Sequence, residues 1–459
     1  MTQPPPYQVT DPATGETLRT LPHATDAEIE AALALSASAF QRWRAVPSAE
    51  RAAILRRVGA LFTERAAELG ALVTREMGKR PSSARGEAAW CSTIFDYYAD
   101  NGPALLADRP LPGHAGALIQ HLPIGPLLGV MPWNYPYSQV ARFAAPNLIA
   151  GNTILVKHAE NCPTSALAIA DLMRDAGVPE GVYVNLFATH EQVATMVADP
   201  RVQGVSLTGS ERAGAAVAEV AGRHLKKVVL ELGGSDPYIV LDAHDVTAAA
   251  EQAWTTRIAN VGQACNSNKR IIVMDDIYDD FVATLVKQAS AMTPRPPGDD
   301  SDTAYSPMVS RRAAETLLAQ VEDAVAKGAT LHTGGDLVSD YGAYFAPAVL
   351  TDVTPQMRAY HEELFGPVAV VYRVSSDEEA VALANAVELG LGGAVWSTDE
   401  QRATRVAGQL EVGMVNVNTP AAEGPDLPFG GIKRSGFGRE LGPIGIHEFV
   451  NQRLFYVQR

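Results

Sequence analysis

The sequence has few cysteines, an excess of acidic over basic residues and no long uninterrupted hydrophobic run. Its three cysteines, Cys91, Cys162 and Cys265, are an odd and sparse set. They are typical of reduced thiols rather than of a disulfide framework. The 37 basic residues against 52 acidic ones give a formal net charge of −15, which opposes binding to nucleic acid or to an anionic membrane. We therefore expect a cytoplasmic protein with neither of these partners.

Patterns for export, membrane insertion and metal binding are also lacking. The start, MTQPPPYQVT, has no basic region followed by an apolar run. Prolines interrupt the uncharged stretch over 110–141 too often for a membrane span. Neither H-E-x-x-H nor C-x-x-C occurs, and the ten histidines are scattered. We expect no catalytic metal, and the absence of G-x-S-x-G argues against a serine hydrolase.

The chain is long enough for two or three domains with sizeable cores. It has 459 residues, of which 47% are hydrophobic and 19% charged, the composition of an ordinary globular protein. Apolar residues repeat at three and four over 26–43 and 50–78, which predicts amphipathic helices. From Gly116 the pattern changes to short apolar runs that end in glycine or proline, such as PLLGVM, NTILVK, VSLTG and PYIVL.

Helical stretches such as Thr164–Ala176 separate these runs. Alternation of strands and helices predicts a doubly wound α/β domain with a parallel sheet, followed by a second alternating block over about 237–428. The chain ends in the β-rich segment IHEFVNQRLFYVQR. Its apolar residues 454–457 need a pairing partner, which either the same chain or a neighbouring subunit could supply.

Two acidic or nucleophilic side chains stand out from their surroundings. Cys265 follows glycine closely in NVGQAC, and Glu231 lies inside the apolar run VLELGG. A thiol is a potential nucleophile, and burial raises the pKa of a carboxyl toward that of a general base. Taken singly, Cys265 is more readily read as a buried core residue, and Glu231 has the alternative reading of one member of a structural ion pair.

Three loops after predicted strands carry polar groups. Asn134 is clamped between two prolines in MPWNYP and could donate to an oxyanion, although turns often contain such asparagines. The loop LTGSERAG opens a helix whose N-terminus favours an anion, although its glycines have a purely structural reading as well. Lys157 and Glu160 follow another strand, where they could hold phosphate and ribose or form a solvated charge pair.

Taken together, six strings resemble the aldehyde dehydrogenase superfamily in order and approximate spacing: PWNYP, LTGS, LELGG, NVGQAC, EELFGPV and LPFGGIKRSGFGRE. The resemblance covers nearly the whole chain. It implies a doubly wound cofactor domain formed by 1–104 and 124–233, and an α/β catalytic domain over 234–428. A small β element for oligomerisation, formed by 105–123 and 445–459, would link homodimers or homotetramers.

The resemblance also implies roles for individual residues. Cys265 matches the nucleophile and Glu231 the base, while Asn134 and the Cys265 backbone N–H match the oxyanion hole. The positions that match the cofactor site are Trp133, Lys157, Glu160, Gly209, Ser210, Gly214, Glu363 and Phe365. The implied reaction is oxidation of an aldehyde to the carboxylic acid, with NAD or NADP as acceptor and a cysteine thioester on the path.

ELGGSDP, KHAEN and HEELFGPVA are most similar to the succinate-semialdehyde dehydrogenases of that family. Arg142 matches an arginine that binds their substrate, whereas Ala259 stands where a second arginine is common and Ser267 where some members have a second cysteine. The guanidinium of Arg142 needs an anionic partner, either a substrate carboxylate or a protein one. Glutarate semialdehyde and plain aliphatic aldehydes remain alternative substrates, and a non-catalytic nucleotide-binding homologue is a third reading.

Glu160 bears on the choice of cofactor. A carboxylate at this position can accept hydrogen bonds from the ribose hydroxyls, but it repels a 2′-phosphate. The sequence therefore predicts a preference for NAD, with NADP as a possible second cofactor.

Overall fold

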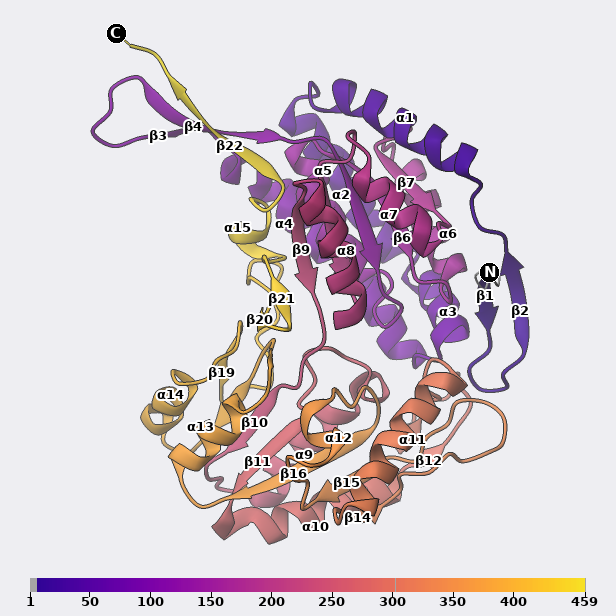
Figure 1. Cartoon of the computed structure of the whole chain (residues 1–459), viewed down its shortest axis with the longest axis vertical. Coiled ribbons are helices and arrows are strands. Elements are labelled where there is room, and N and C mark those ends of the chain that lie inside the picture. The colour runs from indigo at the N-terminus through magenta and orange to yellow at the C-terminus, as the bar shows by residue number, and fades with distance from the viewer. Residues whose placement is uncertain (1–5, 302, 459) are drawn as a thin grey trace.

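The computed structural model, which describes residues 6–301 and 303–458, has two α/β lobes and a three-stranded sheet that projects from the first lobe (Figure 1). The helices of the first lobe are α1 (Asp26–Trp43), α2 (Ser48–Glu64), α3 (Ala66–Met77), α4 (Pro81–Leu105), α5 (Ser138–Ala150), α6 (Pro163–Asp175), α7 (His190–Ala198) and α8 (Glu211–Arg223). Those of the second are α9 (Val246–Ile258), α10 (Asp275–Ala291), α11 (Arg311–Ala326), α12 (Arg358–His361), α13 (Asp377–Asn385) and α14 (Glu400–Ala407). A short helix, α15 (Gly442–Gly445), follows near the end of the chain.

The first lobe contains a six-stranded sheet in the order β21-β9-β8-β5-β6-β7. Its strands are β5 (Pro126–Met131), β6 (Thr153–His158), β7 (Tyr183–Leu186), β8 (Gly204–Thr208), β9 (Lys227–Glu231) and β21 (Gly436–Phe437). All pairs are parallel except that of β21 with β9. The chain runs from β5 outward to β7 and then returns to β8 on the other side of β5. The loops after β5 and β8 therefore flank the switch point, where open α/β sheets bind ligands.

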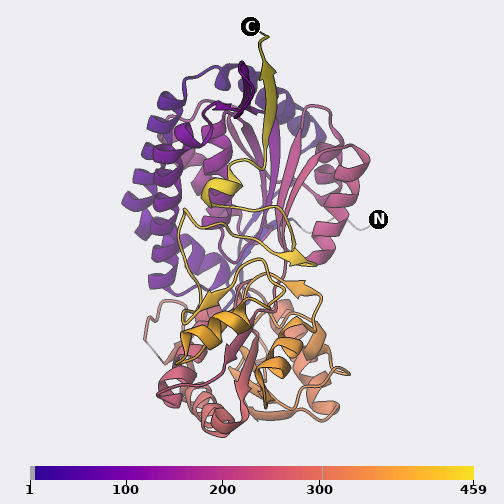
Figure 2. The same ribbon diagram turned by 90° about the vertical axis from the view of Figure 1, so that its left-hand side faces the viewer.

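Alternation along the strands fills both faces of this sheet. Leu127 packs with α2, α3, α4, α5 and α6 on one face, whereas the next residue, Leu128, packs with α1 and α7 on the other. Figure 2 shows these two layers of helices on opposite sides of the strands. Burial on both faces explains why the strand sequences are continuously apolar rather than alternating.

The second lobe has a seven-stranded sheet in the order β14-β15-β16-β11-β10-β18-β19. Its strands are β10 (Pro237–Val240), β11 (Arg270–Met274), β14 (Thr330–Thr333), β15 (Ala348–Thr351), β16 (Val368–Val374), β18 (Ala394–Trp396) and β19 (Asn416–Val417). The remaining short pairs are β1 (Tyr7–Thr10) with β2 (Thr17–Leu21), β12 (Thr293–Pro294) with β13 (Ala304–Tyr305), and β17 (Leu389–Gly390) with β20 (Ile432–Lys433). The predicted fold class, a doubly wound lobe followed by a second α/β lobe and a small β element, is confirmed.

The projecting sheet joins distant parts of the chain. It consists of β3 (Arg109–Pro110), β4 (Ala117–Pro123) and β22 (Val450–Tyr456), in the order β22-β4-β3. Seven residue pairs link β22 to β4, from Val450 opposite Pro123 to Tyr456 opposite Ala117. The terminal strand thus pairs within its own chain along one edge, and its other edge has no strand partner in the described part of the chain.

Two further features qualify the sequence-based description. The helical pattern over 50–78 forms two helices, because the chain leaves the helical geometry at Arg65, between α2 and α3. Among the described residues, no helix is both long and apolar enough to cross a membrane.

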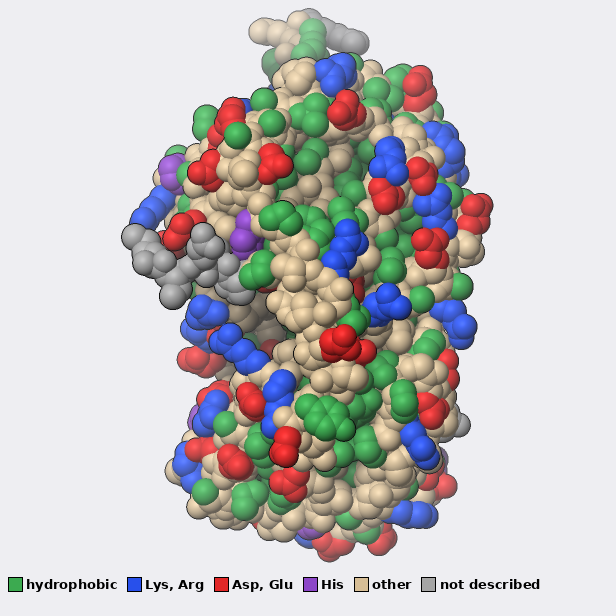
Figure 3. Space-filling view, turned by 90° about the vertical axis from the view of Figure 1, so that its right-hand side faces the viewer, with side chains coloured by type: hydrophobic (Ala, Val, Ile, Leu, Met, Phe, Trp, Pro, Cys, Tyr) green, Lys and Arg blue, Asp and Glu red, His purple; other side chains and the backbone are tan. Residues whose placement is uncertain are grey.

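On the face of the molecule in Figure 3, Lys and Arg side chains are interspersed with Asp and Glu side chains.

Candidate active site

A cavity of about 640 Å³ lies between the two lobes, and Cys265 is in its wall. Other side chains in the wall include Glu87 of α4, Arg142 of α5, Asp236 at the start of β10 and Phe429. Residues from both lobes and from the C-terminal segment therefore enclose one space. A reactive thiol beside buried charged groups in such a space is the arrangement expected of an active site.

The loop before Cys265 has an unusual backbone. Asn260, Val261 and Gly262 have φ values of 50°, 56° and 71°, all in the left-handed region. A Cβ on Gly262 would lie 2.2 Å from the carbonyl oxygen of Gly366, so only glycine fits there. Arg257 links this loop to the Gly366 backbone, since its guanidinium donates to Gly262 O at 3.3 Å and to Gly366 O at 2.7 Å. Such strain persists only where the surroundings impose it.

The Cys265 thiol is neutral at neutral pH in this environment. Burial raises its pKa to about 12, although the positive charges of Arg142 and Lys269 oppose the shift. Lys269 also fixes the backbone of the nucleophile loop, because its ammonium donates to Cys265 O at 2.7 Å and to Ala264 O at 2.6 Å. The thiol must therefore lose its proton to another group before or during attack on a carbonyl.

Asn134 lies in the loop between β5 and α5 and is 5% exposed. Its side-chain Nδ2 donates to Gln263 O at 3.2 Å, which brings the amide next to the Cys265 loop. Asn260 Nδ2 donates to the Asn134 carbonyl at 3.1 Å. The structure therefore brings together the two loops that the sequence singled out separately.

Glu231 ends β9 and is 2% exposed. Both carboxyl oxygens are buried without a hydrogen-bond partner among the described residues. Burial raises the pKa of Glu231 well above its usual value, the negative charge of Glu440 adds to the shift, and Arg142 and Arg439 oppose it. Arg142 thus acts on both the Cys265 thiol and the Glu231 carboxyl. A buried acid whose pKa is raised in this way can take part in proton transfer near neutral pH.

Arg142 has a protein partner in the structure. Its Nη2 lies 2.7 Å from Glu440 Oε2, and both side chains are nearly buried. The guanidinium also lies over the Phe429 ring, 3.8 Å from the centroid. Burial raises the pKa of Glu440 and Arg142 opposes the shift. The protein carboxylate considered from the sequence is therefore present, and the same arginine still lines the cavity.

The loop after β8 has the features of an anion site. Gly209 and Ser210 connect β8 to α8, and the Ser210 hydroxyl caps the helix by accepting from Ala213 N at 3.4 Å. Gly214 permits close packing, because a Cβ there would lie 2.6 Å from Leu232 Cδ2. Thr208 Oγ1, at the end of β8, is buried and has no partner within the described residues. Ahead of Ala213, the backbone N–H groups of Glu211 and Arg212 in the first turn of α8 can donate to a phosphate.

Lys157 lies near the carboxyl end of β6 and forms an ion pair with Glu160. The Lys157 side chain is 4% exposed. His190 Nε2 lies 3.4 Å from Glu160 Oε1. Burial alone would raise the pKa of Glu160, but Lys157 lowers it below the usual value. The carboxylate is therefore charged, and a neighbouring ammonium compensates its charge.

Glu363, Phe365 and Trp133 are connected to the Cys265 loop through Lys269. Glu363 Oε1 lies 2.9 Å from Lys269 Nζ and accepts from Gly234 N at 3.2 Å. The Phe365 and Trp133 rings contact edge to face, with centroids 5.7 Å apart. Because Lys269 bonds both Glu363 and the Cys265 carbonyl, this group is linked directly to the nucleophile loop.

Sequence reasoning missed three charged residues of the site: Lys269, Asp236 and Glu440. Burial raises the pKa of Asp236 to about 7, with Lys269 opposing the shift. Lys269 stands four residues after Cys265, whereas Asp236 lies inside ELGGSDP and Glu440 is the last residue of LPFGGIKRSGFGRE. Their position in or beside a recognised string was the available indication.

Comparison with known proteins identifies the family of this chain. The model of the aldehyde dehydrogenase family matches residues 2–455. The chain belongs to this family. The sequence-based identification is thereby confirmed, and the protein is an aldehyde dehydrogenase that acts as an oxidoreductase on aldehydes.

Among the curated relatives of this aldehyde dehydrogenase is one from Deinococcus radiodurans, named succinate-semialdehyde dehydrogenase (NADP(+)). It is 55% identical over 450 residues, which cover 98% of this chain and 94% of the relative. A protein of Mycobacterium ulcerans with the same type of name is 44% identical, over 98% of this chain and all of its own. A crystal structure of succinic semialdehyde dehydrogenase from Streptococcus pyogenes with NADP+ as the cofactor superposes with a TM-score of 0.96 at 39% identity, covering 99% of this chain and 100% of that one.

The prediction that Glu160 makes NAD the preferred cofactor is wrong. The relatives just described are named for NADP(+), and the Streptococcus structure holds NADP+. Glu160 is not an isolated charge, because Lys157 pairs with it. A compensated carboxylate repels a 2′-phosphate far less than a bare one, because the ammonium supplies an opposing field at the same place.

Proposed function

We propose that this aldehyde dehydrogenase oxidises succinate semialdehyde to succinate with NADP as the acceptor. The main support is that a thiol, Cys265, and a guanidinium, Arg142, line the same cavity. A thiol there can attack an aldehyde carbon, and a guanidinium can hold a carboxylate at the far end of a short substrate. The names of the relatives point to the same substrate and cofactor.

The residues at the switch point fit a dinucleotide. The N-terminus of α8 with Gly209 and Ser210 suits the pyrophosphate, Lys157 and Glu160 suit the ribose, and the orphaned Thr208 hydroxyl lies at the same strand end. Gly214 keeps α8 close to β9, and we assign Trp133, Glu363 and Phe365 to the nicotinamide side. When bound, the nicotinamide accepts a hydride from the reacting carbon.

The chain's own residues account for the other steps. Cys265 Sγ bonds to the aldehyde carbon while the thiol proton passes to solvent water in the cavity, and the carbonyl oxygen becomes negative. The Asn134 amide and the Cys265 N–H donate to this oxygen. After oxidation the substrate is held as a thioester. Glu231 removes a proton from the attacking water, the C–S bond breaks, and the acid leaves as the thiol is restored.

The first expected result concerns the cofactor. We expect kcat/KM with NADP to exceed kcat/KM with NAD by about tenfold or more, which corresponds to about 1.4 kcal/mol. The reason is that Lys157 offsets the charge of Glu160 and can itself attract the 2′-phosphate. Steady-state kinetics with both cofactors at saturating succinate semialdehyde make the measurement. A higher kcat/KM with NAD would contradict the proposal.

The second expected result concerns substrate recognition. In Arg142→Met, which keeps an unbranched apolar stem but removes the guanidinium, we expect KM for succinate semialdehyde to rise at least about tenfold. Butanal has no carboxylate, so its KM is expected to change less than about twofold. The panel also includes glutarate semialdehyde, which tests whether chain length matters.

The comparison between substrates separates recognition from folding. Arg142→Met leaves Glu440 buried without its cation, which destabilises the protein and affects all substrates. Measurement of the thermal midpoint beside the kinetics identifies that effect. Equal losses with butanal and succinate semialdehyde would mean that Arg142 serves only to neutralise Glu440.

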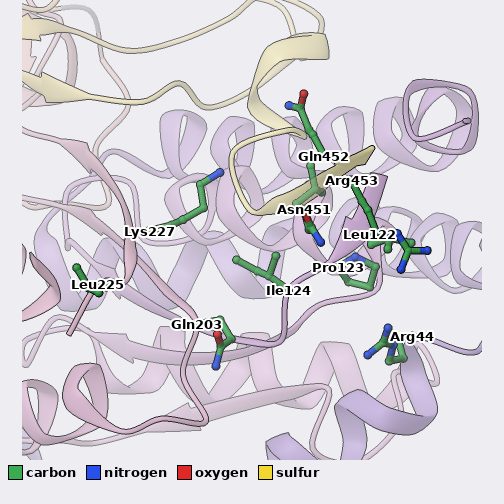
Figure 4. Close-up of a pocket in the computed structure, with 11 residues that line it drawn as sticks. Arg44, Leu122, Pro123, Ile124, Gln203, Leu225, Lys227, Asn451, Gln452 and Arg453 are labelled. Carbon is green, nitrogen blue, oxygen red and sulfur yellow. The ribbon is translucent and has the colours of Figure 1, made fainter. Parts of the chain in front are cut away.

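We also propose that 1–104 and 124–233 form the cofactor domain, 234–428 the catalytic domain, and 105–123 with 445–459 a bridging element in a homodimer or homotetramer. The unpaired edge of β22 supports this role, because exposed apolar strands invite pairing. Leu454, Phe455 and Tyr456 are 60%, 43% and 57% exposed. An open hollow lies at the N-terminal end of β22, and its lining includes the cations Arg44, Lys227 and Arg453 (Figure 4). These positive charges suit contact with a second copy of this acidic chain.

Light scattering after size exclusion tests this assembly. We expect the mass of the wild-type protein to be at least twice the 48.8 kDa of the chain. Leu454→Lys places a charge on the apolar edge and is expected to shift the mass toward that of one chain. Tyr341→Lys, at an exposed apolar residue of the second lobe, is the control. A monomeric wild-type protein would contradict the assembly.

A further inference from the structure

A buried ion pair that the proposed mechanism does not use contacts the Asn134 loop, and its Glu87 also lines the cavity. Lys79 stands in the turn between α3 and α4, and Glu87 is in the second turn of α4. Their side chains are 1% and 2% exposed, and the ammonium contacts the carboxylate directly. Two charges buried in this way are costly, and apolar residues of similar size often stabilise a protein equally well. Stability alone therefore does not explain why this ion pair is buried here.

Lys79 holds the peptide of the candidate oxyanion residue. Its Nζ donates to the Asn134 carbonyl at 2.8 Å and lies 3.8 Å from the centroid of the Tyr135 ring. Burial lowers the pKa of Lys79, and Glu87 opposes the shift. The ammonium thus has three partners in and around one loop, which restricts the peptide plane from which the Asn134 side chain extends.

Glu87 holds the other end of the same loop. Its Oε1 accepts from Tyr137 N at 2.9 Å and from Ser138 N at 3.2 Å, at the start of α5. No side chain caps this helix from the usual preceding position, so Glu87 supplies that function from α4. The pair therefore forms hydrogen bonds to the loop on both sides of Pro136, from Asn134 to Ser138.

The amide of Asn134, in contrast, is held loosely. Within the described residues its side chain makes one hydrogen bond, from Nδ2 to Gln263 O at 3.2 Å, so only that bond is given up when the donor turns to an oxyanion. A donor stabilises a transition state best when its support is already in place. We propose that Lys79 and Glu87 are positioning residues that hold the Asn134 backbone so that its amide is aimed at the oxyanion. This inference rests on the role of Asn134 in the proposed function.

The test uses the full-length enzyme and the double variant Lys79→Met/Glu87→Gln, which removes both charges together and leaves neither one unpaired. We expect kcat to fall about 10- to 100-fold, whereas KM for the aldehyde and the Kd for NADP change less than about twofold. The matched control is Glu76→Gln. Glu76 is a buried carboxylate that accepts from Thr164 N and Ser165 N at the start of α6, and its replacement is expected to leave kcat within about twofold.

A second comparison asks whether the pair acts through Asn134. In an Asn134→Ala background, we expect the double substitution to lower the single-turnover rate less than about twofold further, because the amide that it aims is already gone. If the two losses multiply instead, the pair does not work through Asn134. A wild-type kcat in the folded double variant would also overturn the inference.

Further variants cover failure to fold and failure of the proposed function. Glu87→Gln alone keeps an acceptor for both backbone N–H groups but leaves Lys79 without its anion; if this variant folds, it supplies the same cycle when the double variant is unfolded. A wild-type rate for Asn134→Ala would overturn the oxyanion role itself and, with it, this inference. A normal rate in the pair variant beside a slow Asn134→Ala enzyme would overturn only the inference.

Discussion

Replacement of Cys265 by alanine is expected to lower the rate of aldehyde oxidation by about 10⁴-fold or more, because no other described side chain of the cavity offers a thiol to the carbonyl. Single-turnover formation of the reduced cofactor measures the chemical step directly. Binding of NADP is expected to persist, since the switch-point residues are unchanged.

Cys91→Ala is the matched control for this experiment. Cys91 is a fully buried thiol of α4 whose pKa burial raises well above the usual value. Its replacement removes a sulfur from the core without removing one from the cavity, so we expect a small loss of stability and a rate within a few-fold of wild type. A near-normal rate for Cys265→Ala would contradict the covalent mechanism.

Glu231→Gln is expected to separate the two halves of the reaction. If Glu231 activates the water that attacks the thioester, a first turnover of reduced cofactor survives as a burst, while the steady-state rate falls roughly 10²- to 10⁴-fold. Rapid mixing with succinate semialdehyde and NADP resolves the burst from the steady state. An undiminished steady-state rate would remove Glu231 from the mechanism.

The pH dependence gives this experiment a second measurement. Burial raises the pKa of Glu231, so the carboxylate that acts as the base forms only as the pH rises above the range of an ordinary glutamate. The steady-state rate of the wild-type enzyme is therefore expected to increase with pH, and Glu231→Gln is expected to lose this limb of the profile. Glu76→Gln, which replaces another buried carboxyl, is expected to keep it.

The elements with strong local patterns could be predicted from the sequence. PLLGVM is β5, NTILVK contains most of β6, and the helix expected over Thr164–Ala176 is α6, displaced by one residue. Continuous apolar runs between glycine and proline are decisive for buried parallel strands. The candidate residues Cys265 and Asn134 were also found, because each stands in a short string with a distinctive composition.

Contacts between distant segments could not be predicted in this way. Arg142 pairs with Glu440, 298 positions further along the chain, and no periodicity reports such a partner. The two-residue strand β21 lies in GFG, which has no strand pattern at all, and pairs because β9 offers it an open edge. The error over Glu160 is of a different kind, since Lys157 is only three residues away and its charge could have been included.

The pairing of β21 with β9 also has a consequence for how the molecule is made. Gly436 lies opposite Glu231, so the edge of the first sheet closes only when the ribosome has synthesised nearly the entire polypeptide. Contacts of such sequence separation form late in folding, since a long loop must close first. A nascent chain can therefore fold much of its first lobe early, but the strand that carries Glu231 gains its last neighbour only near the end of translation. Premature termination before residue 436 would leave that strand as a bare edge, open to pairing with other chains.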